Sequence, residues 1–226
     1  MKTLFITFIF LLNGMLAGFS QGFVNLNFES ANAAGHSSGS ISTSSAIPNW
    51  NAYISGVAQS SILYDNQTLS DPAISLQDTN GIYQPIQGSF SVLLQGQFNP
   101  SHNSTSTNSV AIGQTGLIPS VAETLIFSAA ITVGGPYVAN IQLTFNGQNL
   151  NYVPIGSGSN YTIYGADISF FAGQTGQMLF TVPFNGSVFL DNIQFSTSPV
   201  PEPSTLFLSA LSGIFLAWRR WKARAI

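Results

Sequence analysis

The central part of this chain contains no stretch with the residue spacing of a helix. Between residues 21 and 198, no run of ten residues repeats apolar side chains at intervals of three and four, as an amphipathic helix requires. Apolar and polar residues alternate instead over short stretches separated by Gly, Asn, Pro and Ser, which is typical of half-buried strands joined by turns. The pattern predicts an all-β fold, and we expect an antiparallel β-sandwich of the jelly-roll type.

The expected strands lie at residues 21–29, 51–57, 61–64, 73–77, 89–98, 110–113, 124–133, 139–145, 152–155, 160–164, 177–182 and 187–196. In the first of them Val24, Leu26 and Phe28 would face the core. Residues 31–49 are rich in Ser, Gly and Ala and predict a loop. Asn146-Gly147 predicts a tight turn that folds the chain back toward residues 149–153. The sequence GQTG occurs at residues 113–116 and 173–176, which we interpret as two similar turns.

Residues 21–198 contain no Lys, Arg or Cys, so neither disulfides nor ion pairs with Lys or Arg are available to them. Their seven acidic residues give a net charge of about −7, which disfavours binding to nucleic acid or to acidic polymers. A stretch of this length is enough for one domain with a sizeable core. The acidic residues are Glu29, Asp65, Asp71, Asp78, Glu123, Asp167 and Asp191.

The N-terminus has the order of a secretory signal peptide. Lys2 precedes an apolar run of about 16 residues, and Gly18 and Ser20 supply the small residues of a cleavage site. We expect residues 1–20 to be removed, which leaves Gln21 as the first mature residue. The alternative, a first transmembrane helix, is disfavoured because the run is shorter than the roughly 20 residues that span a bilayer.

The C-terminus places a short apolar segment, residues 206–218, before the basic residues Arg219, Arg220, Lys222 and Arg224. As a helix the segment would be about 20 Å long, against a hydrocarbon core of about 30 Å. Trp218 and Trp221 suit the membrane interface, and the basic cluster should remain on the cytoplasmic side. We therefore expect a short transmembrane helix with the bulk of the chain outside. An amphipathic helix packed on the domain is disfavoured, because few polar residues interrupt the segment.

The triplet Pro201-Glu202-Pro203, the apolar segment and the basic tail occur in this order within residues 199–226, which resemble a PEP-CTERM sorting signal. The resemblance implies export by a Gram-negative bacterium, a stay in the inner membrane, and cleavage near the triplet by an exosortase-like enzyme. Proteins with this signal often belong to the extracellular polysaccharide matrix. The expected organisation is a signal peptide (1–20), a β-sandwich domain (21–198) and a sorting signal (199–226).

Few residues of the domain could perform catalysis. Residues 35–39 match G-x-S-x-G, but a nucleophile elbow needs a preceding strand and a following helix. His36 and His102 fall in polar loops, where a general base is poorly held. An enzyme would have to use two carboxylates about 5 to 10 Å apart, as glycosidases do. Asp65, Asp71 and Asp78 have the sequence context of turn residues.

In an extended strand of residues 187–196, Asp191 shares a face with Phe189, Ile193 and Phe195, so we expect it to face the core if they do. A buried carboxylate must be hydrogen-bonded, paired or bound to metal. Asn27-Phe28-Glu29, Trp50 and residues 190–193 are similar to galactose-binding-like jelly-roll carbohydrate-binding modules. That resemblance implies a structural calcium at Glu29 and Asp191, and a core or platform role for Trp50.

Sugar binding would use exposed aromatic faces together with Asn and Gln side chains, both of which the domain supplies. The sequence does not say which aromatic residues bind, because tyrosine is also common in strands for packing alone. The candidates are Trp50, Tyr53, Tyr64, Tyr83, Tyr137, Tyr152, Tyr161 and Tyr164. The four Asn-x-Ser/Thr triplets, at Asn66, Asn103, Asn160 and Asn185, are incidental in a bacterial protein.

The sequence therefore predicts a non-enzymatic, exported cell-surface or matrix protein with a structural, adhesive or weak glycan-binding role. One alternative is a secreted glycan-active enzyme with paired carboxylates, and another is a passive coat protein without affinity for polysaccharide. The low charge and the many strands also predict edge-to-edge pairing between copies.

Overall fold

The computed structural model describes residues 22–68, 70–81, 83–97, 108–131 and 141–200. Within these ranges the chain is mostly β, and no helix is long and apolar enough to cross a membrane. The predicted signal peptide, the Pro-Glu-Pro triplet, the apolar segment, the basic tail, His102, Asn103 and Tyr137 lie outside the described residues.

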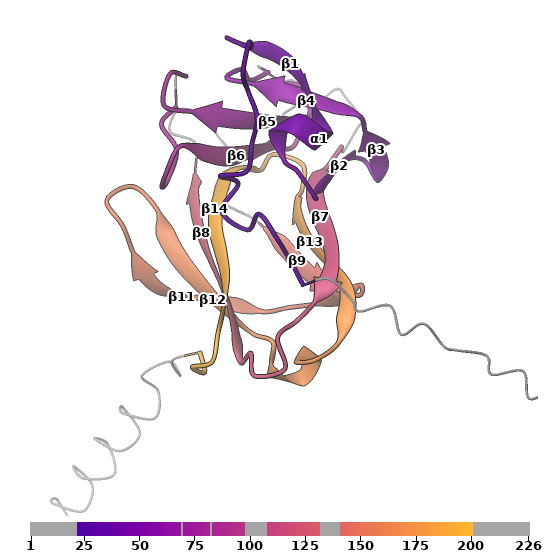
Figure 1. The fold of residues 1–226 in the computed structure, drawn as a ribbon, viewed down its shortest axis with the longest axis vertical. Helices are drawn as coiled ribbons and strands as arrows, with labels where there is room; N and C mark the ends of the chain where they lie inside the picture. The colour runs from indigo at the N-terminus through magenta and orange to yellow at the C-terminus, as the bar shows by residue number, and fades with distance from the viewer. Residues whose placement is uncertain (1–21, 69, 82, 98–107, 132–140, 201–226) are drawn as a thin grey trace, which may run out of the picture.

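Two open sheets form the fold (Figure 1). The larger has the order β1 (Gly39–Ser42), β4 (Ser61–Tyr64), β5 (Ala73–Asp78), β6 (Phe90–Gln95), β14 (Ser187–Ser196), β8 (Thr124–Ile131), β12 (Thr162–Asp167) and β11 (Tyr152–Ser157). The smaller has the order β10 (Gln148–Asn149), β9 (Gln142–Phe145), β13 (Thr175–Val182), β7 (Val110–Leu117), β2 (Asn51–Ile54) and β3 (Val57–Gln59).

All paired strands are antiparallel except β4 and β5, which run parallel. The expectation of a purely antiparallel sheet is therefore wrong at this one junction. Helical structure is limited, in the described residues, to the single turn α1 (Thr43–Ala46) and the 3₁₀ turn η1 (Ser169–Phe171).

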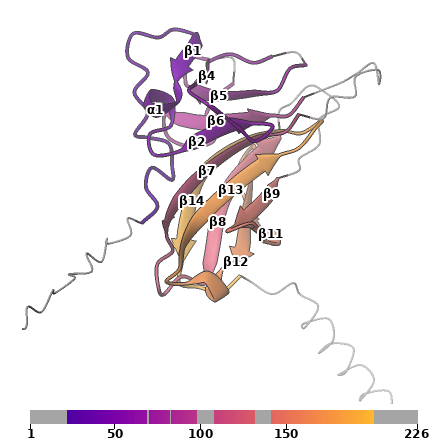
Figure 2. The ribbon, with the colours of Figure 1, turned by 90° about the vertical axis from the view of Figure 1, so that its right-hand side faces the viewer.

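One hydrophobic core lies between the two sheets (Figure 2). A series of aromatic rings crosses it: Trp50 lies 5.6 Å from Phe28 and 6.4 Å from Phe180, and Phe180 lies 5.4 Å from Phe127. Trp50 is 3% exposed, and its indole N–H donates to the carbonyl oxygen of Asn25 at 2.9 Å. Trp50 is thus a core residue rather than a sugar platform.

The predicted strand at residues 21–29 is wrong. Apart from a single bridge between Gly22 and Leu117, this segment is irregular, and Asn25 and Phe28 have φ angles of 51° and 59°. The backbone of Val24 is bonded by the side-chain amide of Gln114 at both its N–H and its carbonyl group, in place of a neighbouring strand. Phe28 nevertheless reaches the core, where it is fully buried.

Several boundaries differ from the prediction because turns and strands were assigned from composition. The loop expected at residues 31–49 contains β1 and α1, and the strand expected at residues 51–57 is a hairpin of β2 and β3 around Ser55 and Gly56. The first GQTG copy lies within β7, and the second ends in the first two residues of β13. The two copies meet in one ladder in which Gly116 pairs with Gly176, so the first is not a turn.

The last strand and the tight turn agree with the sequence. β14 has the predicted bounds, and Asn146 and Gly147 turn the chain from β9 into β10 with φ angles of 48° and 77°.

The face assigned to Asp191 is wrong. A bulge in β14 between Asp191 and Gln194 adds a residue relative to β8, with Asn192 at a φ of 46°. Leu190 and Ile193 consequently face the core, whereas Phe189 lies against Tyr83 of the loop outside the sheet, with ring centroids 5.5 Å apart. Asp191 is buried all the same, beneath that loop.

Candidate functional site

Glu29 and Asp191, predicted as a pair, both bind the loop of residues 86–91. The Glu29 carboxylate accepts the backbone N–H of Ser89 at 2.8 Å and of Phe90 at 3.1 Å. Asp191 accepts the backbone N–H of Gln87 at 3.0 Å and the hydroxyl of Ser91 at 2.8 Å. We call residues 86–91, which comprise this loop and the first two residues of β6, the carboxylate-held loop.

The backbone of this loop is shaped to receive the Glu29 side chain. Gly88 has a φ of 61°, and a β-carbon added there would lie 2.2 Å from the Glu29 carboxylate oxygen. Glycine fits best here, because the positive φ strains a residue with a side chain and an added β-carbon would have to displace the Glu29 carboxylate. Ser91 completes the loop by accepting the N–H of Ile86 at 2.8 Å.

Burial raises the pKa of Asp191 to about 6, although hydrogen bonds from Ser91, Asn192 and Gln87 act in the opposite direction. The negative charge of Glu29 adds to the rise. The domain supplies no Lys or Arg to offset either charge. The pair is therefore satisfied by N–H and O–H donors.

Calcium takes six to eight oxygen ligands. The partners of both carboxylates are hydrogen-bond donors, and among the described residues no three His, Cys, Asp or Glu side chains gather as a metal-binding group. The two carboxylates by themselves supply fewer oxygen ligands than a calcium ion takes. Calcium stays a hypothesis that rests on the resemblance.

A second pair of carboxyl groups was not foreseen as a pair. Asp65 directly follows β4, and Asp78 is the last residue of β5, the strand parallel to β4. The Asp65 carboxylate accepts the backbone N–H of Asp78 at 2.9 Å. The Tyr64 hydroxyl donates to Asp78 at 2.6 Å, and the side chain of Asn80 donates to the same oxygen at 3.0 Å. The sequence signal was their position next to two neighbouring strands, but the parallel pairing was not predicted.

Their environment separates the two pKa values. Burial raises the pKa of Asp65 to about 6. The backbone N–H of Asp78 acts in the opposite direction, whereas the side chain of Asp78 and its charge add to the rise. Burial alone would also raise the pKa of Asp78, but hydrogen bonds from Tyr64 and Asn80 outweigh it and lower this pKa to about 2. Burial and Asp78 raise the pKa of Tyr64. Around pH 4 to 5 Asp65 keeps the proton that Asp78 has lost.

We consider three clefts in the described part of the chain, and no carboxylate lines any of these three. The first has a volume of about 340 Å³ and brings together three of the candidate tyrosines, Tyr152, Tyr161 and Tyr164. We call it the tyrosine cleft. Ala129, Val188 and Ile141 line its apolar part, and the turn of residues 158–162 supplies Ser159, Asn160 and Thr162.

The tyrosine rings are held by contacts with the core and with the carboxylate-held loop. The Tyr152 hydroxyl donates to the carbonyl oxygen of Ile141 at 2.8 Å, and its ring lies 5.2 Å from that of Tyr164. Tyr164 in turn stacks on Phe127 at 5.4 Å. The side-chain amide of Gln87 donates to the Tyr161 hydroxyl at 2.8 Å. Glu29 and Asp191 thus position Tyr161 at the cleft through the loop that they hold.

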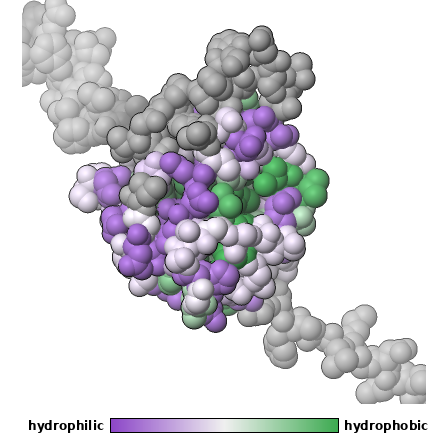
Figure 3. Space-filling model, turned by 90° about the horizontal axis from the view of Figure 1, so that it is seen from above, coloured by the Kyte–Doolittle hydropathy of each residue, from purple (hydrophilic) through white to green (hydrophobic). Residues whose placement is uncertain are grey.

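The other two clefts fit a sugar less well. The second, of about 350 Å³, lies on the smaller sheet and has Tyr53 as its one aromatic residue, beside Leu179 and Gln177. The third, of about 180 Å³, is lined largely by apolar residues that include Ile54, Leu63 and Pro72. It belongs to the upper end of the molecule, whose surface seen from above has both polar and apolar areas (Figure 3).

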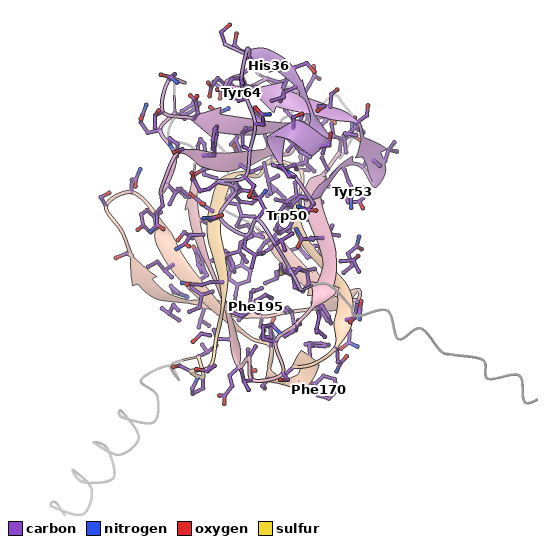
Figure 4. All side chains as sticks on the ribbon, in the orientation of Figure 1. His36, Trp50, Tyr53, Tyr64, Phe170 and Phe195 are labelled. Carbon is purple, nitrogen blue, oxygen red and sulfur yellow. The ribbon has the colours of Figure 1, made fainter. Side chains whose placement is uncertain are left out.

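The remaining candidates lie apart from the tyrosine cleft. His36 is exposed, with its ring 6.4 Å from that of Tyr64 at the upper end of the molecule (Figure 4). Residues 35–39 form no nucleophile elbow, because β1 follows them instead of a long helix. Tyr64 is buried against Asp78, and Tyr83 packs on Phe189.

Comparison with known proteins identifies the C-terminal signal. Residues 199–220 match the family model of the PEP-CTERM protein-sorting motif. The motif implies an exported protein that is sorted at a membrane by an exosortase-like enzyme. No curated protein matches the chain.

Two solved structures resemble the chain distantly. One is the enzymatically active domain of the bacteriophage CBA120 tailspike protein 4, with 12% identity, a TM-score of 0.39 and 78% of this chain covered; the match spans 21% of the tailspike chain. The other is the carbohydrate-binding module TmCBM27, studied for specific mannan recognition, with 13% identity and a TM-score of 0.37. Its match covers 69% of this chain and 94% of the module.

Proposed function

We propose that the protein is exported, held in the inner membrane by residues 206–218, cut near Pro201-Glu202-Pro203, and left at the cell surface or in the polysaccharide matrix. The PEP-CTERM motif at residues 199–220 is the observation that carries this proposal. The apolar segment and the basic residues Arg219, Arg220, Lys222 and Arg224 supply retention and orientation.

Replacing Pro201, Glu202 and Pro203 by alanine tests the sorting step in the native host. Cleavage requires the triplet in this proposal, so the variant should accumulate in the cell envelope while the natural chain reaches the medium or the matrix. A matched variant with Thr197→Ala, outside the motif, should behave as the natural chain. Equal release of both variants would contradict the proposal.

We further propose that the domain is a jelly-roll variant that binds a neutral glycan weakly in the tyrosine cleft. Aromatic faces at Tyr152 and Tyr164 and polar groups at Ser159, Asn160 and Thr162 are the materials that sugar recognition uses. No charged side chain lines the cleft among the described residues, which suits an uncharged sugar. Its volume is at the lower end of ligand sites, enough for one or two sugar rings.

Affinity electrophoresis in gels that contain neutral polysaccharides tests the binding. The chain should be retarded by at least one of them, and Asn160→Ala and Tyr161→Ala should reduce that retardation. Tyr53→Ala changes the second cleft and should leave it unchanged. A chain that no polysaccharide retards would be the passive coat protein, and loss of retardation only in Tyr53→Ala would place the site on the smaller sheet.

We propose that the domain is not an enzyme. The carboxyl pairs support this, because Asp65 and Asp78 are in direct contact rather than separated for a water or a sugar, and the partners of Glu29 and Asp191 are structural donors. Reducing-sugar release from the polysaccharide that retards the chain, abolished by Asp65→Asn, would establish the glycan-active alternative.

A further inference from the structure

Three large hydrophobic side chains are strongly exposed in the described part of the chain, and two of them lie at the same end of the molecule. Phe170 is 78% exposed in η1, and Val121 is 67% exposed in the connection between β7 and β8. The third, Val57, is 65% exposed on the distant hairpin of β2 and β3. Figure 4 places Phe170 at the lower end, far from Tyr53 of that hairpin.

The two loops that carry Phe170 and Val121 are bonded to each other. Three backbone hydrogen bonds join them. The N–H of Ile118 donates to the carbonyl oxygen of Gln174 at 3.0 Å, and the N–H of Gly173 donates to that of Ile118 at 3.1 Å. The N–H of Ile168 donates to the carbonyl oxygen of Glu123 at 2.9 Å. Phe171, next to Phe170, is buried with its ring 5.0 Å from that of Phe145. Phe170 is thus held outward on an anchored turn. We call Val121 and Phe170 the apolar tips.

The chain leaves the domain at this same end. The last strand pairs Ser196 with Thr124, the N–H of Glu123 donates to the carbonyl oxygen of Ser196 at 2.8 Å, and the Thr124 hydroxyl donates to that of Ser198 at 2.7 Å. Glu123 therefore joins the exit of the chain to the loops of the apolar tips. In Figure 1 the yellow end of β14 lies at the bottom, as does Phe170 in Figure 4.

The tether to the membrane is short. Seven residues, 199–205, separate Ser198 from Leu206, where the apolar segment begins. The eight steps from residue to residue span at most about 29 Å when fully extended. A compact domain of this length is about 40 Å across, from its expected radius of gyration of about 16 Å. While residues 206–218 are in the bilayer, the end that carries the apolar tips therefore stays within about 29 Å of the lipid, and the domain cannot turn over completely.

We propose that the apolar tips, Val121 and Phe170, dock on the lipid surface while the chain is tethered, which presents the upper end of the domain away from the membrane. This inference rests on the membrane anchoring in the proposed function. The partner is an uncharged or zwitterionic lipid interface, because Glu123 and Asp167 lie beside the tips and the domain has no basic residue to attract anionic lipid. Phe is suited to this contact because its ring is apolar throughout.

The absence of cysteine from the chain allows a direct test with the full-length protein in phosphatidylcholine nanodiscs. Single variants Phe170→Cys, Val121→Cys and, as the matched exposed control, Val57→Cys carry an environment-sensitive fluorophore. Spin-labelled lipid should quench the label at positions 170 and 121, with a blue-shifted emission, and should leave position 57 unaffected. Added anionic lipid should not strengthen the effect.

Tryptophan emission in the same samples separates the two possible failures. Trp218 and Trp221 report insertion of the C-terminal segment, whereas Trp50 is buried in the domain core. Quenched tryptophans with labels at 170 and 121 as exposed as the label at 57 would overturn the docking and leave the anchoring intact. Unquenched tryptophans would overturn the anchoring, and the docking with it. Protection that follows protein concentration rather than lipid would indicate a second copy and overturn the proposal.

Discussion

A single buried carboxyl group, Asp191, should make the domain less stable as the pH rises from about 4 to about 6. Its pKa in the folded state is about 6, against an ordinary value of 3.8, so over this interval the folded protein holds a proton that the unfolded chain has released. Stability then falls with rising pH, by up to about 3 kcal/mol at roughly 1.4 kcal/mol per pH unit. Urea unfolding at pH 4, 5, 6 and 7 measures this slope.

Asp191→Asn should flatten the slope, whatever its effect on stability at one pH. Asp65, whose pKa is also raised, contributes the same sign and leaves part of the slope in place. As the pH is lowered below about 4, stability should decrease, because Asp78 has a lowered pKa and becomes protonated in this range.

The same series with calcium and with a chelator tests the calcium hypothesis. Stability that rises from pH 4 to 7 only with calcium would show a metal bound at the pair.

Gly88 is a second residue that is in contact with a carboxylate, here that of Glu29, and this contact should determine the cost of replacing it. Gly88→Ala should lower the free energy of unfolding by about 1 to 3 kcal/mol, because the new methyl group must displace the Glu29 carboxylate from the loop. Gly56→Ala is the matched control: its φ is 78°, so it carries similar backbone strain, but nothing lies within 4 Å of the added carbon. Urea midpoints of both variants give the comparison.

A double mutant separates the clash from the strain at Gly88. In a Glu29→Ala background the added methyl group meets no carboxylate, so Gly88→Ala should then cost no more than Gly56→Ala. An unchanged cost in that background would show that the loop is not shaped around Glu29.

At the scale of elements, the sheet edges argue against the pairing between copies that composition suggested. β10 has two residues and β3 three, and the longer edge strand β11 carries Pro154 and an irregular register between Pro154 and Gly156. Short edges, proline and bulges are the devices that prevent edge-to-edge association. We therefore expect a monomer once the C-terminal segment has been removed.

Pro154→Val should restore a donor to the edge of β11 and increase self-association. Light scattering of the natural and variant domains over a concentration series measures the effect. The control is Pro119→Val, since Pro119 is exposed in the connection between β7 and β8 and not on a sheet edge. This variant should not associate more than the natural domain. Natural protein that already forms large assemblies would show that the edges pair despite Pro154.

The elements that the sequence predicted best are those with strict alternation and explicit turn residues. β14 and the turn at Asn146-Gly147 agree because each is encoded locally. The segment 21–29 alternates equally well but is no strand, because the side chain of Gln114, ninety residues away, takes the hydrogen bonds that a neighbouring strand would have made. The bulge after Asp191 could not be foreseen either, and it places Ile193 on the opposite face of the strand from Asp191.

The candidate site was predictable as residues but not as an arrangement. Tyr152, Tyr161 and Tyr164 were among the aromatic candidates, and Glu29 and Asp191 were predicted as partners. Only the fold shows that these three tyrosines share a cleft. It also shows that the two carboxylates hold the loop from which Gln87 donates to the Tyr161 hydroxyl. Asp65 and Asp78 were interpreted as separate turn residues because the parallel pairing of β4 and β5 was not apparent.

At the scale of the whole molecule, the distribution of charge divides the chain into parts with different tasks. Four of the five basic residues lie after the sorting triplet, and the domain before it has none. In the proposed function the basic residues orient the chain in the membrane, and release at the triplet leaves an acidic domain free of them. In the proposed docking, the exit of the chain beside the apolar tips sets which end of the domain meets the membrane before release.

Intact mass spectrometry of the protein from its native host, with cell envelope and medium compared, tests this account most directly. The account predicts a mature chain in the medium or matrix that begins at Gln21 and ends near residues 201–203, with the longer form confined to the envelope. A chain that still ends at Ile226, found only in the membrane, would contradict the release on which the proposed function depends.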